Sequence, residues 1–261
     1  STGTSIPDTR QTRCVSVTNN QFIDLVPINY AIDVITTTDG TITIDENNSS
    51  QAVVIDANVF ENVQAPILNI YNSSFISFTN NIVRKYDSPQ NEEYVIVFEG
   101  TDAKMRQFNF SGNQVRIFDD GIDVGFIYSA NSVQIIEHLN VCNNTYYGGE
   151  DDSFIILRNL GLNNFVISNN TIQGNLDTAG SFGGVGIILS DASIGIISNN
   201  LIEYANTNGI RLNGAYNVRM QNNIIGNCGQ TSAEKEIRLE DGTSITTTDR
   251  IYIQYNTLHD N

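Results

Sequence analysis

An asparagine-rich motif that recurs through the chain constrains its fold more than any other feature of the sequence. Seven segments share the motif: FTNNIV, FSGNQV, VCNNTY, ISNNTI, ISNNLI, MQNNII and IQYNTL. Aligning them places one asparagine of each segment in a common column: Asn81, Asn113, Asn144, Asn170, Asn200, Asn223 and Asn256. Subtracting their numbers gives spacings of 32, 31, 26, 30, 23 and 33 residues. Uneven spacing is typical of a solenoid whose coils share one rigid corner and accept insertions at the others.

The residues around each aligned asparagine alternate as they do in a β-strand. Positions five and three before it are apolar, with Gly195 as the one exception, and so is the position two after it. Residues two apart lie on one face of a strand, so the pattern predicts a strand, a sharp turn at the asparagine and a second strand. Amides stacked about 4.8 Å apart in neighbouring coils can bond to one another. Antiparallel hairpins are the alternative, but they favour Asn-Gly, whereas Asn-Asn here precedes Ile, Thr or Leu.

A third apolar run lies between consecutive asparagine motifs. It reads YVIVFEG, GFIYSA, FIILRN, GIILSD, GIRLNG and EIRLED in successive coils. The pairs predicted to point inward are Ile96/Phe98, Phe126/Tyr128, Ile155/Leu157, Ile187/Leu189, Ile210/Leu212 and Ile237/Leu239. The chain is therefore predicted to be all-β, with three strands in each coil and an internal asparagine ladder.

An internal asparagine ladder after the second strand, with longer loops elsewhere, resembles the right-handed parallel β-helix of the pectate-lyase-like superfamily. That superfamily includes polysaccharide lyases and hydrolases and phage tailspikes, and the same coil also builds non-enzymatic adhesins. The resemblance covers residues 65–261, and residues 1–64 are expected to form an N-terminal cap with one or two less regular coils. The final LHDN contains no capping element, so we expect either further chain or an end-to-end partner, such as another copy, to cover the last coil.

The composition excludes several classes of partner. Lys and Arg total 13 against 29 Asp and Glu, a net charge of −16, which repels nucleic acids and anionic membranes. No apolar run of 18 residues is present, so membrane insertion is not expected. The three cysteines include no Cys-x-x-Cys motif, which argues against structural zinc. Cys142 and Cys228 are predicted to lie three coils, or roughly 14 Å, apart, too far for a disulfide bond.

In the resembled enzymes the substrate groove follows the first strand of each coil, so its outward residues are candidates for a binding site. One outward column is predicted to contain Val97, Ile127, Ile156, Ile188, Arg211 and Arg238, and the next Glu99, Ser129, Arg158, Ser190, Asn213 and Glu240. Arginines stacked one strand spacing apart need carboxylates or an anionic ligand between them. A surface salt bridge would use Glu240, Asp241 and Asp191. The alternative is a substrate-binding strip for uronate polysaccharides, formed by Arg158, Arg211, Arg238 and Glu240.

Two acidic segments precede the first strands of successive coils. They contain Asp119, Asp120 and Asp123, and then Glu150, Asp151 and Asp152. Coil stacking would bring them together beside Arg158. Glycoside hydrolysis needs one protonated and one ionised carboxyl group, which makes Asp119, Asp120, Asp151 and Asp152 candidate catalytic residues. Carboxylate oxygens also suit Ca²⁺, with Asp119, Asp120, Glu150 and Asp151 as the alternative metal ligands. Solvated acidic loops are the third interpretation.

Two functions therefore remain open for a protein expected outside the cell, on a cell surface or on a virion. The first is polysaccharide binding with degradation, as a glycoside hydrolase or polysaccharide lyase, which the acidic segments and arginines favour. The second is a non-catalytic adhesin or fibre subunit. It is favoured by the absence of tryptophan and of the Gly-His-Gly and Arg-Ile-Lys motifs that polygalacturonases share. His138 is expected at the surface rather than as a catalytic base.

Overall fold

The fold is made of short parallel strands that wind into stacked coils. The computed structural model describes residues 15–23, 32–34, 52–62, 67–70, 75–85, 94–98, 104–117, 125–129, 135–148, 154–157, 161–174, 184–205, 207–228, 236–241 and 248–259. Over these ranges it contains 26 β-strands. No helix in these ranges has the length and apolarity needed to cross a membrane. The all-β prediction is confirmed.

The strands form three sheets, which we name A, B and C. Sheet A contains β1 (Val15–Thr18), β4 (Val53–Asp56), β7 (Phe75–Thr79), β10 (Lys104–Ser111), β13 (Ile135–Cys142), β16 (Gly161–Ser168), β19 (Ala192–Ser198), β22 (Tyr216–Gln221) and β25 (Tyr252–Gln254). Sheet B contains β2 (Gln21–Ile23), β5 (Val59–Glu61), β8 (Ile82–Lys85), β11 (Gln114–Ile117), β14 (Thr145–Tyr147), β17 (Thr171–Gln173), β20 (Leu201–Glu203), β23 (Ile224–Gly226) and β26 (Thr257–His259). Sheet C contains β3 (Ile32–Val34), β6 (Leu68–Ile70), β9 (Ile96–Phe98), β12 (Ile127–Ser129), β15 (Ile155–Leu157), β18 (Ile187–Ser190), β21 (Ile210–Asn213) and β24 (Ile237–Glu240).

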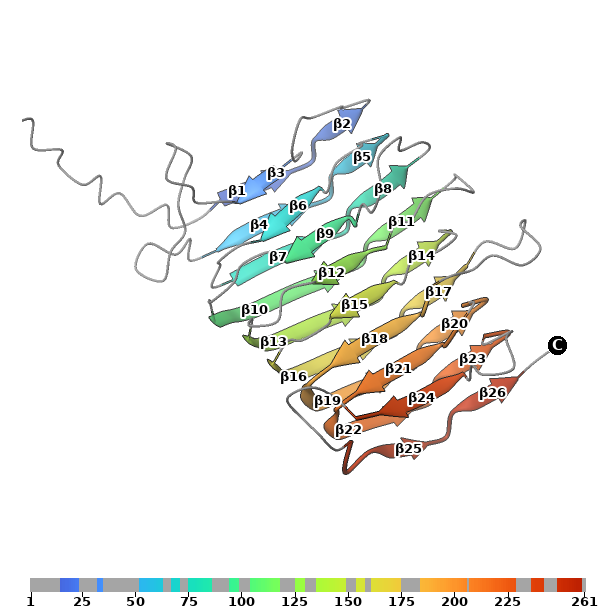
Figure 1. Cartoon of the computed structure of the whole chain (residues 1–261). Helices are drawn as coiled ribbons and strands as arrows, with labels where there is room; N and C mark the ends of the chain where they lie inside the picture. The colour runs from blue at the N-terminus through green and yellow to red at the C-terminus, as the bar shows by residue number, and fades with distance from the viewer. Residues whose placement is uncertain are drawn as a thin grey trace, which may run out of the picture.

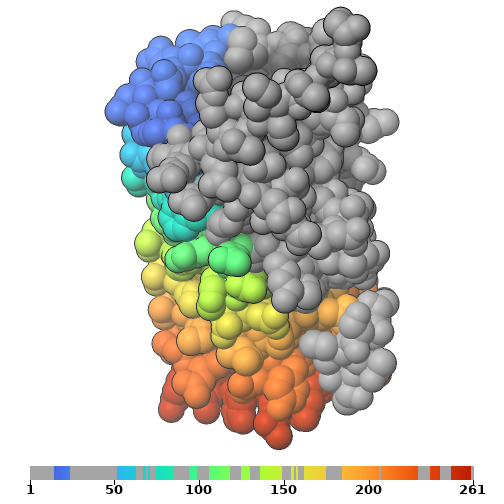
Figure 2. All heavy atoms as spheres, turned by 90° about the vertical axis from the view of Figure 1, so that its left-hand side faces the viewer, coloured from blue at the N-terminus to red at the C-terminus, as the bar shows by residue number. Residues whose placement is uncertain are grey.

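Each strand pairs in parallel with the strand three places along the chain, so each of the first eight coils contributes one strand to each sheet, and β25 and β26 extend sheets A and B. Figure 1 shows the resulting stack of coils. In the side view of Figure 2 the colours follow one another in bands from blue to red along the stack. The described part of the N-terminal 64 residues joins the same sheets, because β1 and β2 pair with β4 and β5. The predicted three-strand parallel coil is confirmed.

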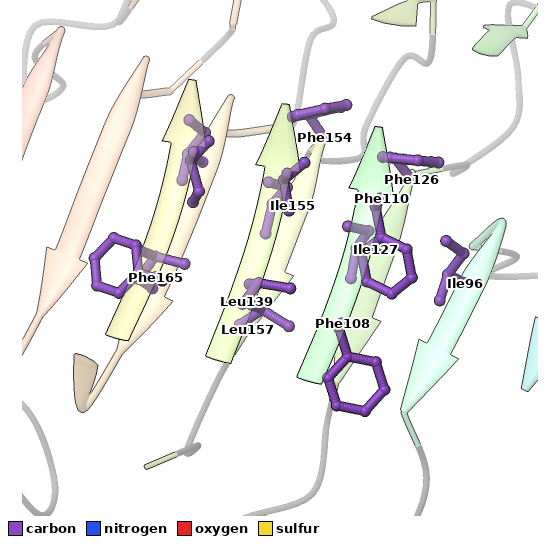
Figure 3. Close-up of a cluster of buried hydrophobic side chains, with 14 of the residues drawn as sticks. Ile96, Phe108, Phe110, Phe126, Ile127, Leu139, Phe154, Ile155, Leu157 and Phe165 are labelled. Carbon is purple, nitrogen blue, oxygen red and sulfur yellow. The ribbon is translucent and has the colours of Figure 1, made fainter. Parts of the chain in front are cut away.

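The core lies inside the coils and is built from the inward positions that the repeat defines. Phe108, Phe110 and Val115, at five and three before and two after Asn113, are at most 2% exposed. Figure 3 shows buried phenylalanine and leucine side chains of sheet A gathered with isoleucine and leucine side chains of sheet C. Apolar side chains from all three sheets therefore share one continuous interior.

The asparagine ladder runs through this interior as predicted. The Oδ1 atom of Asn170 accepts hydrogen bonds from the backbone nitrogen and the Nδ2 atom of Asn144, both at 3.0 Å. Its own Nδ2 donates to Oδ1 of Asn200 and to the carbonyl oxygen of Val141, both at 2.9 Å. The same pattern extends toward the N-terminus to Asn58 and Asn20, two positions beyond the predicted ladder.

The sharp turn is centred on the residue before each ladder asparagine, and not on the asparagine itself as predicted. This residue has a left-handed backbone at Asn19, Ala57, Asn80, Gly112, Asn143, Asn169, Asn199, Asn222 and Tyr255, with φ between 54° and 69°. Asparagine and glycine tolerate that conformation better than other residues. The two asparagines of each Asn-Asn pair thus have separate roles, the first in the turn and the second in the ladder.

The predicted register of β12 is wrong by one residue. Ile127 pairs with Ile96 and Ser129 with Phe98, so Ile127 and Ser129 point inward and are fully buried. Phe126 lies at the corner, where its ring stacks on Phe154 at 5.4 Å. Tyr128 points outward in place of Ile127. The sequence pattern favoured an aromatic pair inside, whereas ring stacking at the corner shifts the strand.

Gly195 interrupts the inward column because a neighbouring ring occupies its place. A Cβ atom at Gly195 would lie 2.1 Å from Cε1 of Phe165, one coil away. Phe165 is 2% exposed, so its ring has no open space to move into. The Phe165 ring therefore fills the space that a side chain at position 195 would need.

Cys142 and Cys228 are both free thiols, as predicted. Cys142 is partly exposed, and its Sγ lies 2.8 Å from Oδ1 of Asn140, whereas Cys228 is buried. Cys14 lies outside the described residues.

Candidate functional site

A groove of about 890 Å³ follows the outer face of sheet A. Two adjacent outward columns line it, at six and four residues before the ladder asparagines. The first column consists of Phe75, Gln107, His138, Asn164, Ile194 and Asn217, and the second includes Asn109, Asn140, Val166, Ile196, Arg219 and Tyr252. The lining begins on β7 and ends on β25. Six strand spacings correspond to roughly 29 Å, so the groove is long and lies parallel to the solenoid axis.

The lining is rich in amides and contains no carboxylate among the described residues. Amide side chains carry both a donor and an acceptor, and here they are most frequent on β10 and β13 and recur at Asn164 and Asn217. Nδ2 of Asn140 donates to Oδ1 of Asn109 at 2.9 Å across these strands. Arg219 and Tyr252 lie at the end nearest β25, and aliphatic side chains lie between that end and β13. A chain with a net charge of −16 thus has a groove without negative side chains.

Backbone turns within sheet A shape one edge of the groove. Asn164, Ile194 and Asn217 occupy equivalent positions in β16, β19 and β22, and all have left-handed φ values, of 51°, 57° and 56°. Arg250, at the same place before β25, has φ 54°. Asparagine is common in this conformation, but a β-branched residue such as Ile194 is a genuine outlier.

A second polar cluster lies on β21 and β24 of sheet C. Arg211 and Arg238 occupy paired positions, as predicted. Oε2 of Glu240 accepts from Nε of Arg211 at 2.7 Å and lies 2.6 Å from a terminal nitrogen of the same guanidinium. Oε1 of Glu240 lies 2.5 Å from a terminal nitrogen of Arg238. One carboxylate therefore bridges both arginines.

The bridge changes the titration of Glu240. Burial by itself would raise the pKa of this carboxyl, but the hydrogen bond and charge of Arg211, followed by those of Arg238, outweigh it and hold the pKa below its usual value. Of the other proposed partners, Asp191 is buried and Asp241 is exposed. This geometry is the surface salt bridge that the sequence left open. Binding of a sugar carboxylate by these arginines stays a prediction.

The acidic segments fall outside the described residues. They include all the candidate catalytic and calcium-binding side chains: Asp119, Asp120, Glu150, Asp151 and Asp152. Arg158 also lies outside them. The strands on either side of the two segments pair as neighbours, β11 with β14 and β12 with β15. Across the described ranges, no three or more His, Cys, Asp or Glu side chains gather as a metal site would require. The carboxylate pair and the calcium site stay predictions.

One comparison with known protein families identifies the fold family. The family described as the right handed beta helix region matches residues 94–261, more than half of the chain. The chain belongs to the right-handed β-helix family. In this β-helix protein the matched region begins just before β9, although β1 to β8 belong to the same sheets and ladder. Searches of curated proteins and of solved structures returned no match.

Along most of its length, sheet C of the β-helix does not present the outward face expected for a substrate groove. Val97 and Ile188 of the predicted outward column are buried at 8% and 3% exposure, in a cluster with Tyr94, Val185 and Tyr128. The rings of Tyr94 and Tyr128 stack at 4.4 Å. From β9 to β18 the described residues of this column are apolar or aromatic, and charged residues follow at Arg211 and Arg238.

Sequence reasoning missed the groove of the β-helix although the repeat contained the signal. Positions four and six before each ladder asparagine are the outward residues of sheet A, and they can be read from the alignment alone. His138 is exposed, as expected, but it lines the groove rather than a featureless surface. The resemblance to β-helix enzymes directed attention to the first strand of each coil instead.

Proposed function

We propose that this β-helix protein binds an extended polysaccharide along the groove of sheet A and does not cleave it there. The observation that carries the proposal is the long groove itself, which crosses β7 to β25 and is lined by amides without a carboxylate. A polymer is favoured over a compact ligand because the lining repeats once per coil along roughly 29 Å.

The chemistry of the lining suits sugars better than other polymers. Hydroxyl groups donate and accept, and amide side chains such as Gln107, Asn109 and Asn217 can satisfy both roles. The exposed apolar side chains of the groove can pack against the C–H faces of sugar rings. Other ligand sites likewise combine apolar walls with a few polar groups. Nucleic acids are disfavoured because the net charge of −16 repels phosphates.

The absence of carboxylates from the described lining argues against hydrolysis in the groove. Hydrolysis by the usual route requires two carboxyl groups on either side of the glycosidic bond. None of the described residues that line the groove supplies one. A non-catalytic glycan-binding role, as in an adhesin or a surface fibre outside the cell, therefore fits the groove best. Degradation remains a separate prediction that depends on the acidic segments.

The test begins with a glycan array and continues with calorimetry on the best ligand. The double variant Gln107→Ala/His138→Ala removes two polar groups from the groove. We expect affinity to fall at least roughly fivefold, since two net hydrogen bonds of about 0.5–1.5 kcal/mol each together contribute about 1–3 kcal/mol. Gln114→Ala is the matched control, because Gln114 is also an exposed glutamine of the same coil but lies on sheet B.

Two outcomes would overturn the proposal. One is the absence of any glycan ligand on the array. The other is equal affinity of the wild-type protein and the groove variant while Gln114→Ala also binds normally. Assays for reducing ends and for unsaturated products at 235 nm on the same ligand should stay at background, and product formation that the groove variant abolishes would contradict binding without cleavage.

A further inference from the structure

Three aliphatic side chains stand exposed in the middle of the sheet A groove. Val166 on β16 and Ile196 on β19 are directly paired, and Ile194 lies two residues before Ile196. Their exposed fractions are 39%, 38% and 50%. Amides border this aliphatic cluster on both sides along the groove, Asn140 and Asn164 on one side and Asn217 beside Arg219 on the other. An apolar island within a polar groove indicates a ligand that carries apolar groups at one place.

The backbone of Ile194 strengthens this interpretation. Equivalent residues in the coils before and after it are Asn164 and Asn217, which share its left-handed conformation. Asparagine would therefore fit the backbone better, and the half-exposed isoleucine adds little to the core. Strained residues of this kind are retained where they contribute to a function, and they cluster at ligand sites.

We propose that Val166, Ile194 and Ile196 form a subsite for a methyl group of the bound saccharide, from either an acetyl substituent or a 6-deoxy sugar. This inference rests on the proposed polysaccharide binding and adds its chemical selectivity. Transfer of a methyl group out of water corresponds to about fourfold in affinity. A second protein is a poorer occupant, because the cluster contains three side chains and stable protein interfaces bury 20–30 residues on each side.

Three probes test the subsite: O-acetylated glucomannan oligosaccharides, the same oligosaccharides after mild alkali, and rhamnan oligosaccharides. Alkali removes ester-linked acetyl groups, whereas the methyl of a 6-deoxy sugar survives it. We expect wild-type protein to bind either the acetylated glucomannan or the rhamnan at least threefold more tightly than the de-acetylated glucomannan. The probe that binds more tightly identifies the source of the methyl group.

The decisive variant is Ile194→Asn. It should keep or raise the unfolding temperature, because asparagine suits the left-handed backbone, and it should reduce the preference for the methyl-bearing probe to below twofold. Ile194→Val keeps a branched aliphatic side chain and should retain the preference. The matched control is Ile224→Asn, since Ile224 is 45% exposed on sheet B, away from the groove.

The outcomes separate this inference from the proposed function. Equal binding of all three probes by wild-type protein would overturn the methyl subsite and leave polysaccharide binding intact. Binding of none of these probes, and of no other glycan on the array, would overturn both. The subsite is also wrong if Ile224→Asn reduces the preference as much as Ile194→Asn does. Self-association of wild-type protein that Ile194→Asn abolishes would assign the cluster to a contact between copies instead.

Discussion

At the scale of single residues, hydrogen-bond capacity determines which side chain can occupy the ladder. An asparagine amide has two donor hydrogens and an oxygen with two lone pairs, and Asn170 uses all four. An aspartate would lack the donors, and a leucine would lack both kinds of group. The repeat therefore keeps asparagine for a chemical reason rather than for turn propensity alone.

Replacing Asn170 with leucine should lower the free energy of unfolding by about 1–3 kcal/mol, because it leaves the buried polar groups of neighbouring coils without partners. Chemical denaturation followed by circular dichroism measures the change. Gln114→Leu, at an exposed position of sheet B, should change stability by less than about 0.5 kcal/mol. An effect of Asn170→Leu no larger than that of the control would contradict an interior ladder.

Gly195→Ala should destabilise the protein by about 1–3 kcal/mol, because the new Cβ meets the Phe165 ring in a packed core. The same denaturation experiment gives the value. Adding Phe165→Leu to Gly195→Ala should recover part of the loss, since the two residues share one space. Strict additivity of the two single changes would show that the Gly195 position is not filled by the ring.

At the scale of strands, the pairing of β21 with β24 places Arg211 beside Arg238, and the Glu240 carboxylate offsets the repulsion between the two positive charges. The pKa of Glu240 is lowered in the folded protein. The resulting stabilisation is fully present above its usual value of 4.5 and is lost as the pH falls through the lower, folded-state pKa. The strand pair is therefore weakened by acid.

Glu240→Gln should reduce stability at pH 7 by about 0.5–1 kcal/mol, a modest value because all three side chains are partly exposed to water. The difference from wild type should shrink at an acidic pH below the lowered pKa of Glu240, where its carboxyl is protonated. Denaturation midpoints at the two pH values measure it. A difference that stays constant between them would contradict the electrostatic origin.

The sequence predicts the strands well where the alternation is unambiguous and less well where two registers bury apolar groups. The inward columns and the ladder follow from a period of two on either side of a fixed asparagine. In β12 both Phe126/Tyr128 and Ile127/Ser129 are possible inward pairs, and ring stacking between coils chooses the second. The left-handed backbone of Ile194 could not be predicted, because intrinsic preference opposes it.

At the scale of the whole molecule, the coil repeat turns short motifs into long surfaces. Each coil contacts only its neighbours, so the sheets, the ladder and the groove all extend by addition of like units. The family and the fold follow from this repetition. The ligand selectivity of a surface does not follow from the repetition. It depends on the outward residues that differ from coil to coil, such as the aliphatic cluster of Val166, Ile194 and Ile196.

The spacing of the coils also determines which polymers can contact every coil in the same way. The groove offers one set of side chains about every 4.8 Å, whatever the length of the loops elsewhere in each coil. A polymer with that repeat stays in step with the protein from β7 to β25. A polymer whose repeat differs from the coil spacing by about a tenth is displaced by half a spacing after five coils. Such a ligand meets its matching side chains at one end of the groove and the gaps between them at the other.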